Sequence, residues 1–186
     1  MDNLSLFNSL DEQIAVRFTG RLNVLDRMSR QMVGVVILKD GEIYRCDFRG
    51  SYGLKAFFNM AIESAQLIQL DYIVEPEIIN DESREIYLSY EELKAQSAEA
   101  IERYMKYSSR RPPANLRLMI KSEFLAPNRE ELRDIEFRVL CTPTEWNKVE
   151  DIYRNCPLQD YEITEALVDL RRKDAIKTIA LRSTEQ

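Results

Sequence analysis

The chain has 186 residues, 45% of them hydrophobic and 31% charged, and carries a net charge of −6 at pH 7. It contains no histidine, the commonest general base and a frequent metal ligand, which argues against many enzyme classes. The acidic balance argues against a broad nucleic-acid surface, because affinity for phosphates depends on lysine and arginine. The length predicts one compact domain or two small ones.

The sequence predicts a cytoplasmic protein without a cofactor or a metal. The sequence contains no run of eighteen apolar residues, the length that a transmembrane helix needs, and the N-terminus lacks the features of a secretory signal. Neither a GxxxxGK[ST] loop nor a GxGxxG fingerprint is present. Cys46, Cys141 and Cys156 are odd in number and show no CxxC spacing, which is typical of reduced thiols.

The N-terminal part alternates between apolar and polar residues in a way that predicts several strands. We expect one or two short strands over 13–25, a strand over 33–38 and a return strand over 42–48. Asp40-Gly41 lies between the last two and predicts a tight hairpin turn. A further strand is predicted over 66–74.

A helix is predicted over 53–64, with Ser51 as its N-cap, because apolar residues recur there at helical spacing. The first eighty residues therefore indicate an α+β fold, a small and mainly antiparallel sheet with one covering helix.

The longest helical pattern covers 89–108, capped by Ser89, and ends at Arg110-Arg111-Pro112-Pro113. Its thin apolar stripe leaves two interpretations open, a connector between two domains or a helix that forms a homodimer. The candidate dimer residues are Leu93, Ile101, Tyr104 and Met105.

The remaining chain predicts three helices and a strand, the outline of a winged-helix module. The first helix covers about 128–141, the second follows Pro143, the third covers about 158–173, and the strand covers 175–181. We therefore expect an α+β domain over 1–88, a linking helix and linker over 89–113, and a three-helix winged-helix-like domain over 114–186.

Three groups of residues in the N-terminal part resemble the PATAN domain, which occurs in bacterial signalling proteins. They are Thr19-Gly20-Arg21-Leu22-Asn23-Val24, then Gly34 through Asp40-Gly41-Glu42-Ile43, and Gly53-Leu54-Lys55-Ala56, within residues 14–75. The resemblance implies a non-enzymatic component that works through protein contacts, and it brings no catalytic residues with it. The C-terminal outline also resembles segments that accompany such domains.

One candidate site is the loop before the predicted helix at 53, formed by Arg49, Gly50, Ser51, Tyr52 and Gly53. The free amides of a helix N-terminus favour anions, and Arg45 and Lys55 are close in sequence. Three interpretations remain: a structural turn, a small anionic ligand, or a partner contact through Tyr52.

A second candidate is the basic cluster of Arg171, Arg172, Lys173 and Lys177. In a DNA-binding regulator the third helix would enter the major groove by its N-terminal half, yet that half is acidic. Cations are also favoured in a last helical turn whatever the function. The resemblance thus implies a signalling adaptor that binds protein partners, with DNA binding by the C-terminal module as the alternative and an enzyme that uses carboxylates as a third interpretation.

Overall fold

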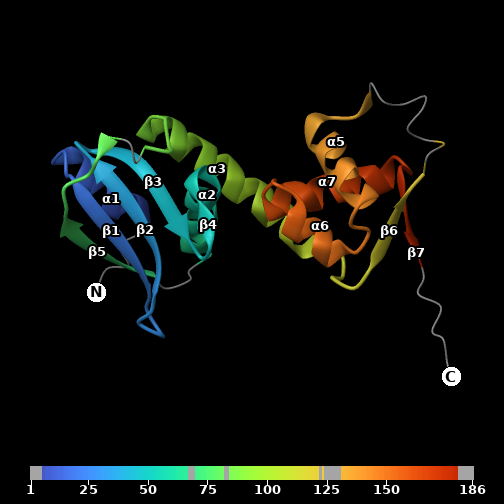
Figure 1. Cartoon of the computed structure of the whole chain (residues 1–186), viewed down its shortest axis with the longest axis horizontal. Coiled ribbons are helices and arrows are strands. Elements are labelled where there is room, and N and C mark those ends of the chain that lie inside the picture. The colour runs from blue at the N-terminus through green and yellow to red at the C-terminus, as the bar shows by residue number, and fades with distance from the viewer. Residues whose placement is uncertain (1–5, 67–69, 82–83, 122, 124–130, 180–186) are drawn as a thin grey trace. The chain divides into compact units, whose positions relative to one another are not determined.

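The computed structural model describes residues 6–66, 70–81, 84–121, 123 and 131–179 (Figure 1). The fold is α+β, as the sequence predicts, and the chain divides into two compact units, Met1–Glu102 and Arg103–Gln186. No helix within the described ranges is both long and apolar enough to cross a membrane.

The first unit contains a five-stranded antiparallel sheet with the order β4-β3-β2-β1-β5. The hairpin between β2 and β3 turns at Asp40 and Gly41, whose φ values of 51° and 81° are those that the predicted tight turn needs. The strands are β1 (Gly20–Asp26), β2 (Met32–Lys39), β3 (Glu42–Phe48), β4 (Ser51–Tyr52) and β5 (Leu70–Pro76).

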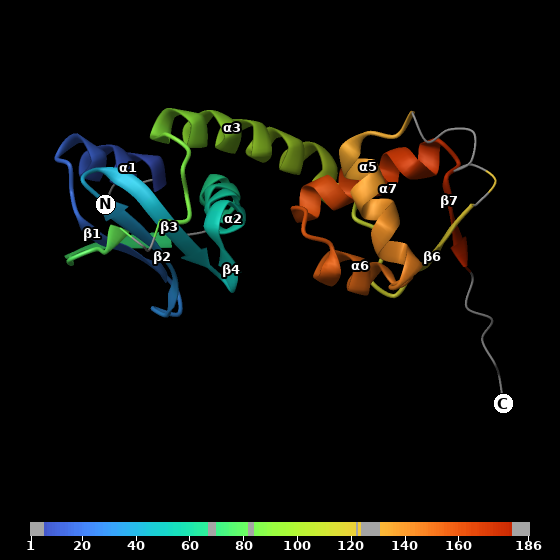
Figure 2. The same ribbon diagram turned by 45° about the horizontal axis from the view of Figure 1, so that its top comes forward.

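Two helices, α1 (Leu6–Ala15) and α2 (Gly53–Ala65), cover one face of this sheet (Figure 2). The expectation of a single covering helix was therefore wrong. Of the range 13–25, predicted to hold one or two short strands, only residues 20–25 lie in a strand, and α1 extends to Ala15. Leu6 and Leu10 lie one helical turn apart and are both fully buried, so α1 is held by packing that its short pattern did not reveal.

The start of α2 also differs from the prediction. Tyr52, not Ser51, occupies the N-cap position, and its side chain makes no capping hydrogen bond. Ser51 instead pairs with Phe48 in the short edge strand β4. In α3 (Tyr90–Tyr107) the predicted cap is confirmed, because the amide of Ser89 donates to Glu92 Oε2 at 2.8 Å and Ser89 Oγ accepts from the Glu92 amide at 3.3 Å.

The boundary between the units falls inside α3, so the helix predicted over 89–108 contributes residues to both units. Within the Arg-Arg-Pro-Pro segment, the Arg111 guanidinium stacks on the Tyr153 ring at 4.1 Å and donates to Asp160 at 2.9 Å. The predicted linker is therefore packed as part of the second unit.

Residues 131–179 contain the three helices that the sequence predicts, and the described residues of the second unit also form a two-stranded antiparallel sheet whose first strand, β6, the sequence did not reveal. The predicted helix start near 128 lies outside the described residues. The elements are η2 (Ser108–Arg110), β6 (Arg117–Ile120), α5 (Asp134–Cys141), η4 (Thr142–Thr144), α6 (Val149–Asn155), α7 (Asp160–Arg172) and β7 (Ile176–Ile179).

Candidate functional site

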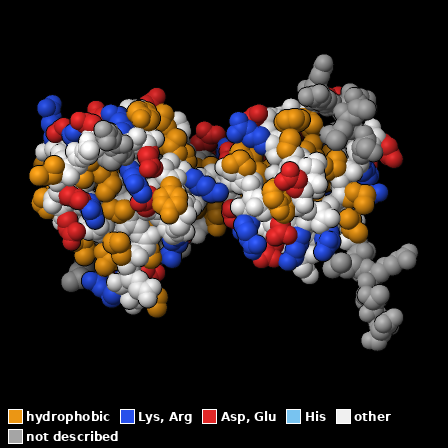
Figure 3. Space-filling view, in the orientation of Figure 1, with side chains coloured by type: hydrophobic (Ala, Val, Ile, Leu, Met, Phe, Trp, Pro, Cys, Tyr) orange, Lys and Arg blue, Asp and Glu red, His pale blue; other side chains and the backbone are white. Residues whose placement is uncertain are grey.

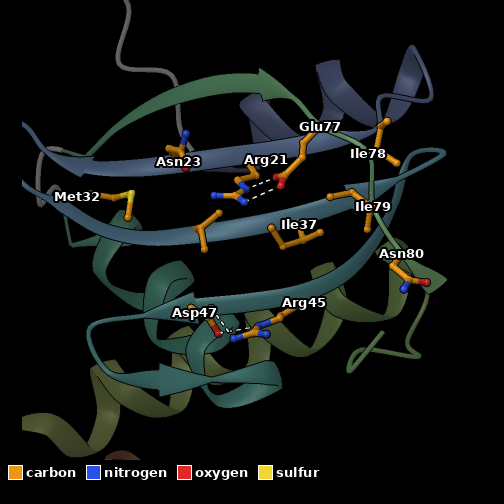
Figure 4. A pocket seen from close by; sticks show the side chains of 11 residues that line it. Arg21, Asn23, Met32, Ile37, Arg45, Asp47, Glu77, Ile78, Ile79 and Asn80 are labelled. Atoms are coloured by element: carbon orange, nitrogen blue, oxygen red, sulfur yellow. Dashed lines mark hydrogen bonds and ion pairs between the residues drawn. The ribbon is translucent and has the colours of Figure 1, made fainter. Parts of the chain in front are cut away.

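The face of the five-stranded sheet opposite α1 and α2 is the candidate site, and we call it the open face (Figure 4). Side chains alternate along a strand, so residues such as Val36 and Leu38 lie in the core while Val35 and Ile37 lie on the open face and remain partly exposed. Neither Val35 nor Ile37 belongs to the first core cluster, in which the buried residues of α1 and α2 pack against the inward residues of the sheet.

Strand register aligns the outward residues in two rows across the open face. The first row runs from β4 to β5 through Tyr52, Asp47, Val35, Asn23 and Ile73. The second row lies two residues further along each strand from the first. In it Ile37 lies between two arginines, and a carboxylate follows on β5; its members are Arg45, Ile37, Arg21 and Glu75. The central strand β2 therefore contributes only apolar side chains to these rows, and its neighbours contribute polar ones.

A pocket of about 380 Å³ opens on this face. Met32 lines one end, and the segment Glu77–Asn80, which follows β5, lines the other (Figure 4). Within that segment Ile78 is 98% exposed, so it adds an apolar side chain to this end of the pocket. The volume is within the range of ligand pockets. We call this hollow the trough, and we call its apolar residues on β2, Met32, Val35 and Ile37, the floor.

Most charges of the open face form mutual pairs, and the remaining carboxylate, Glu75, accepts a hydrogen bond from Asn23. Arg21 Nη2 donates to Glu77 Oε1 at 2.6 Å, and this contact raises the pKa of Arg21 and lowers that of Glu77. Arg45 donates to both carboxylate oxygens of Asp47, at 3.2 and 3.0 Å, which raises the pKa of Arg45. The face is therefore nearly neutral, and it favours a partner with charges of both signs over a single strong ion.

The predicted loop at Arg49–Gly53 gives little support to an anion site. Arg49 donates to Glu63 Oε2 at 2.9 Å and lies near Asp26, while Arg45 is paired as described above. Gly50 and Gly53 have positive φ values, so the structural-turn interpretation explains them. Tyr52 is 64% exposed and belongs to the first row of the open face, which joins this part of the loop to the candidate site.

The predicted dimer stripe on α3 is mostly used within the chain. Leu93 is fully buried in the core of the first unit, and Ile101 packs partly buried against the same core, so neither is available to a second copy. Tyr104 is partly exposed and Met105 is 66% exposed. Apolar residues at helical spacing occur both in helices that pack inside their own chain and in helices that bind a partner, so the sequence pattern could not separate the two interpretations.

The predicted basic cluster is divided by its contacts. Lys173 Nζ donates to Glu136 Oε2 at 2.8 Å and to the Glu131 carbonyl at 2.9 Å, so Lys173 is the counterion of a buried carboxylate. Arg172 lies 3.3 Å from Asp169, and Arg171 and Lys177 are exposed. On the face of the second unit drawn in Figure 3, Lys and Arg side chains alternate with Asp and Glu.

The N-terminal half of α7, which a DNA reader would place in the major groove, is largely inside the second unit. It is buried around most of its circumference, with the exposed Asp160 and the half-buried Glu162 as its outward charges. The buried residues of this helix are Tyr161, Ile163, Thr164, Glu165, Ala166, Leu167 and Leu170.

Glu165, on that half of α7, lies between Arg133 and Arg103, whose nitrogens approach its two oxygens at 2.7 and 2.9 Å. Burial raises the pKa of Glu165, but the hydrogen bonds from the two guanidinium groups outweigh it, and the pKa is lowered. A lowered pKa means that the folded state prefers the ionised carboxylate, so this contribution to stability is present at neutral pH and lost as the pH falls.

We therefore expect the urea concentration at the midpoint of unfolding of the second unit to decrease as the pH is lowered from 7 to 3.5. The fluorescence of Trp146, the chain's single tryptophan, reports this unfolding. The loss should begin below about pH 4.3, the ordinary range of a glutamate. Glu165→Gln should lower the midpoint at pH 7 and make it less dependent on pH. An unchanged pH dependence in this variant would contradict the assignment.

Reactive groups of other kinds are sparse in the described ranges. Burial raises the pKa of the Cys46 thiol far above its ordinary value, so it is held as an unreactive core residue. Cys156 is also buried, and Cys141 is exposed. Among the described residues no group of three or more cysteine or acidic side chains is arranged to hold a metal ion.

The sequence pointed to only part of the open face. The alternation in 42–48 predicts Ile43, Arg45 and Asp47 on one side of a strand; Arg45 and Asp47 do lie on the open face, but Ile43 lies in the core because the register shifts between Ile37 and Leu38. The rows depend on the register of five strands, which the pattern of one strand does not contain. Comparison of the chain with protein-family models, with curated proteins and with solved structures gave no match.

Proposed function

We propose that the protein is a non-enzymatic adaptor of bacterial signalling, located in the cytoplasm, that acts through protein–protein contacts, as its resemblance to the PATAN domain implies. The observation that carries this proposal is the open face, where partly exposed Val35 and Ile37 of β2 lie between the polar residues that project from β1 and β3. Apolar residues surrounded by polar ones are typical of protein interaction surfaces.

The alternative, DNA binding by the second unit, has weaker support. The helix that would enter the groove is buried along its N-terminal half, and Lys173 of the basic cluster neutralises Glu136. The exposed cations Arg171 and Lys177 remain for that interpretation, but two cations neutralise few phosphates.

Site-specific photo-cross-linking in cells of the native host tests the proposal. A benzophenone side chain would replace Ile37 on the open face, Lys177 on β7, or Glu12 on the exposed side of α1 as a control. We expect position 37 to form a discrete adduct with a protein, and position 12 to form none. An adduct of nucleic acid at position 177, without a protein adduct at 37, would support the DNA-binding alternative instead.

A further inference from the structure

We propose that the open face binds an amphipathic α-helix of about three turns from a partner protein. This inference rests on the proposed function and adds the kind of partner segment that the face accepts. It is carried by the width of the apolar floor, by its length, and by the signs of the charges on either side.

The width of the floor fits one helix. Val35 and Ile37 project from the central strand β2, and polar residues project from β1 and β3 on its two sides, among them Arg21 and Arg45. Those two arginines lie two strand spacings apart, which is about 10 Å. An α-helix with its side chains has a diameter of about 10–12 Å, so one helix covers the apolar residues and its flanks reach both polar strands.

The length of the floor is also limited. It runs from Met32 to Ile37, five residues along β2 or about 17 Å, which equals about three helical turns. Beyond Ile37 the next outward residue is Lys39, whose ammonium is bonded to Asp81. The segment Glu77–Asn80 borders the same end, so the trough is bounded there.

The charges select a helix with both signs on its flanks. On β3 the outward residues are Arg45 and Asp47, and beside Arg21 on β1 lies Glu77. A helix with only basic or only acidic flanks would bring like charges together on each side and lose affinity. An extended peptide would use different groups, the outer backbone of one of the edge strands, β4 or β5.

Selection of peptides on the full-length protein provides the test, with a phage library of random 16-residue linear peptides as the probe. We expect enriched sequences to carry apolar residues at i, i+4 and i+7 or i+8, to have flanks of both signs, and to become helical on binding. Amide shifts in NMR spectra should centre on residues 32–37 and their neighbours in the two rows. A version of the best peptide with every flanking charge made lysine should bind at least fivefold more weakly.

Two surface variants localise the binding. Ile37→Asp and Val35→Asn should each weaken the selected peptides at least tenfold, with far-UV circular dichroism unchanged, and Glu12→Lys should stay within twofold. Peptides with alternating apolar residues and amide shifts along β4 or β5 would overturn the inference in favour of strand addition. Lack of enrichment would also overturn it, as would self-association of the chain that Ile37→Asp abolishes. A discrete protein adduct at position 37 would leave the adaptor proposal intact in each of these cases.

Discussion

Replacement of Lys173 by methionine is expected to lower the free energy of unfolding of the second unit by about 3 kcal/mol. Lys173 Nζ lies 2.8 Å from Glu136 Oε2, and the Glu136 side chain is fully buried. The carboxylate also accepts a hydrogen bond from the Arg133 amide at 2.7 Å, which fixes it at the start of α5. Without the ammonium, a buried negative charge would lose its closest counterion.

Arg171→Met is the matched control, because Arg171 lies in the same cluster and is exposed. We expect it to change stability by less than about 0.5 kcal/mol, as is usual for surface substitutions. Urea unfolding followed by Trp146 fluorescence compares the two variants. Adding Glu136→Gln to Lys173→Met should restore part of the loss, since the glutamine can still accept the Arg133 amide and carries no charge. Equal stability of the two single variants would contradict the assigned role of Lys173.

This lysine illustrates which features the sequence could predict. The sequence indicated a cation in the last turn of a helix, which is a local feature, but its partner Glu136 is 37 residues away and could not be identified. The hairpin at Asp40-Gly41 and the helix α2 were predicted correctly because their turn residues and periodicity are local. Strand β6 was missed because its four residues are held as a strand by pairing with β7, almost sixty residues later.

The open face shows the same limit from the functional side. Arg45 and Asp47 were placed on one side of their strand by alternation alone. Their relation to Ile37, Arg21 and the segment after β5 depends on register and on bulges, such as the shift between Ile37 and Leu38. A one-residue slip would exchange the two faces of a strand, so burial of the opposite face against α1 and α2 is what determines which residues are available to a partner.

Gly34→Ala is the second substitution with a large expected effect, a loss of about 3 kcal/mol from the first unit. Gly34 lies opposite Phe48 in the β2–β3 pair, and an added Cβ would be 2.6 Å from the Asp47 carbonyl oxygen and 2.7 Å from the Phe48 ring. The backbone oxygen belongs to the adjacent strand, so neither neighbour can move without disturbing the sheet. The close approach of the two strands is thus a physical reason for glycine at position 34. The resemblance to the PATAN domain includes this glycine but gives no reason for it.

Gly50 provides the contrast. An added Cβ there would meet nothing within 4 Å, but the residue has a φ of +78°, which side chains other than that of glycine rarely adopt. Gly50→Ala should therefore cost about 1 kcal/mol, through backbone strain alone. Asparagine tolerates this conformation, so Gly50→Asn should cost less than Gly50→Ala, whereas Gly34→Asn should cost at least as much as Gly34→Ala. Urea unfolding followed by circular dichroism, with amide exchange in β2 and β3, measures all four variants. If alanine and asparagine substitutions rank in the same order of stability loss at both positions, a single mechanism would account for both glycines and the distinction drawn here would be wrong.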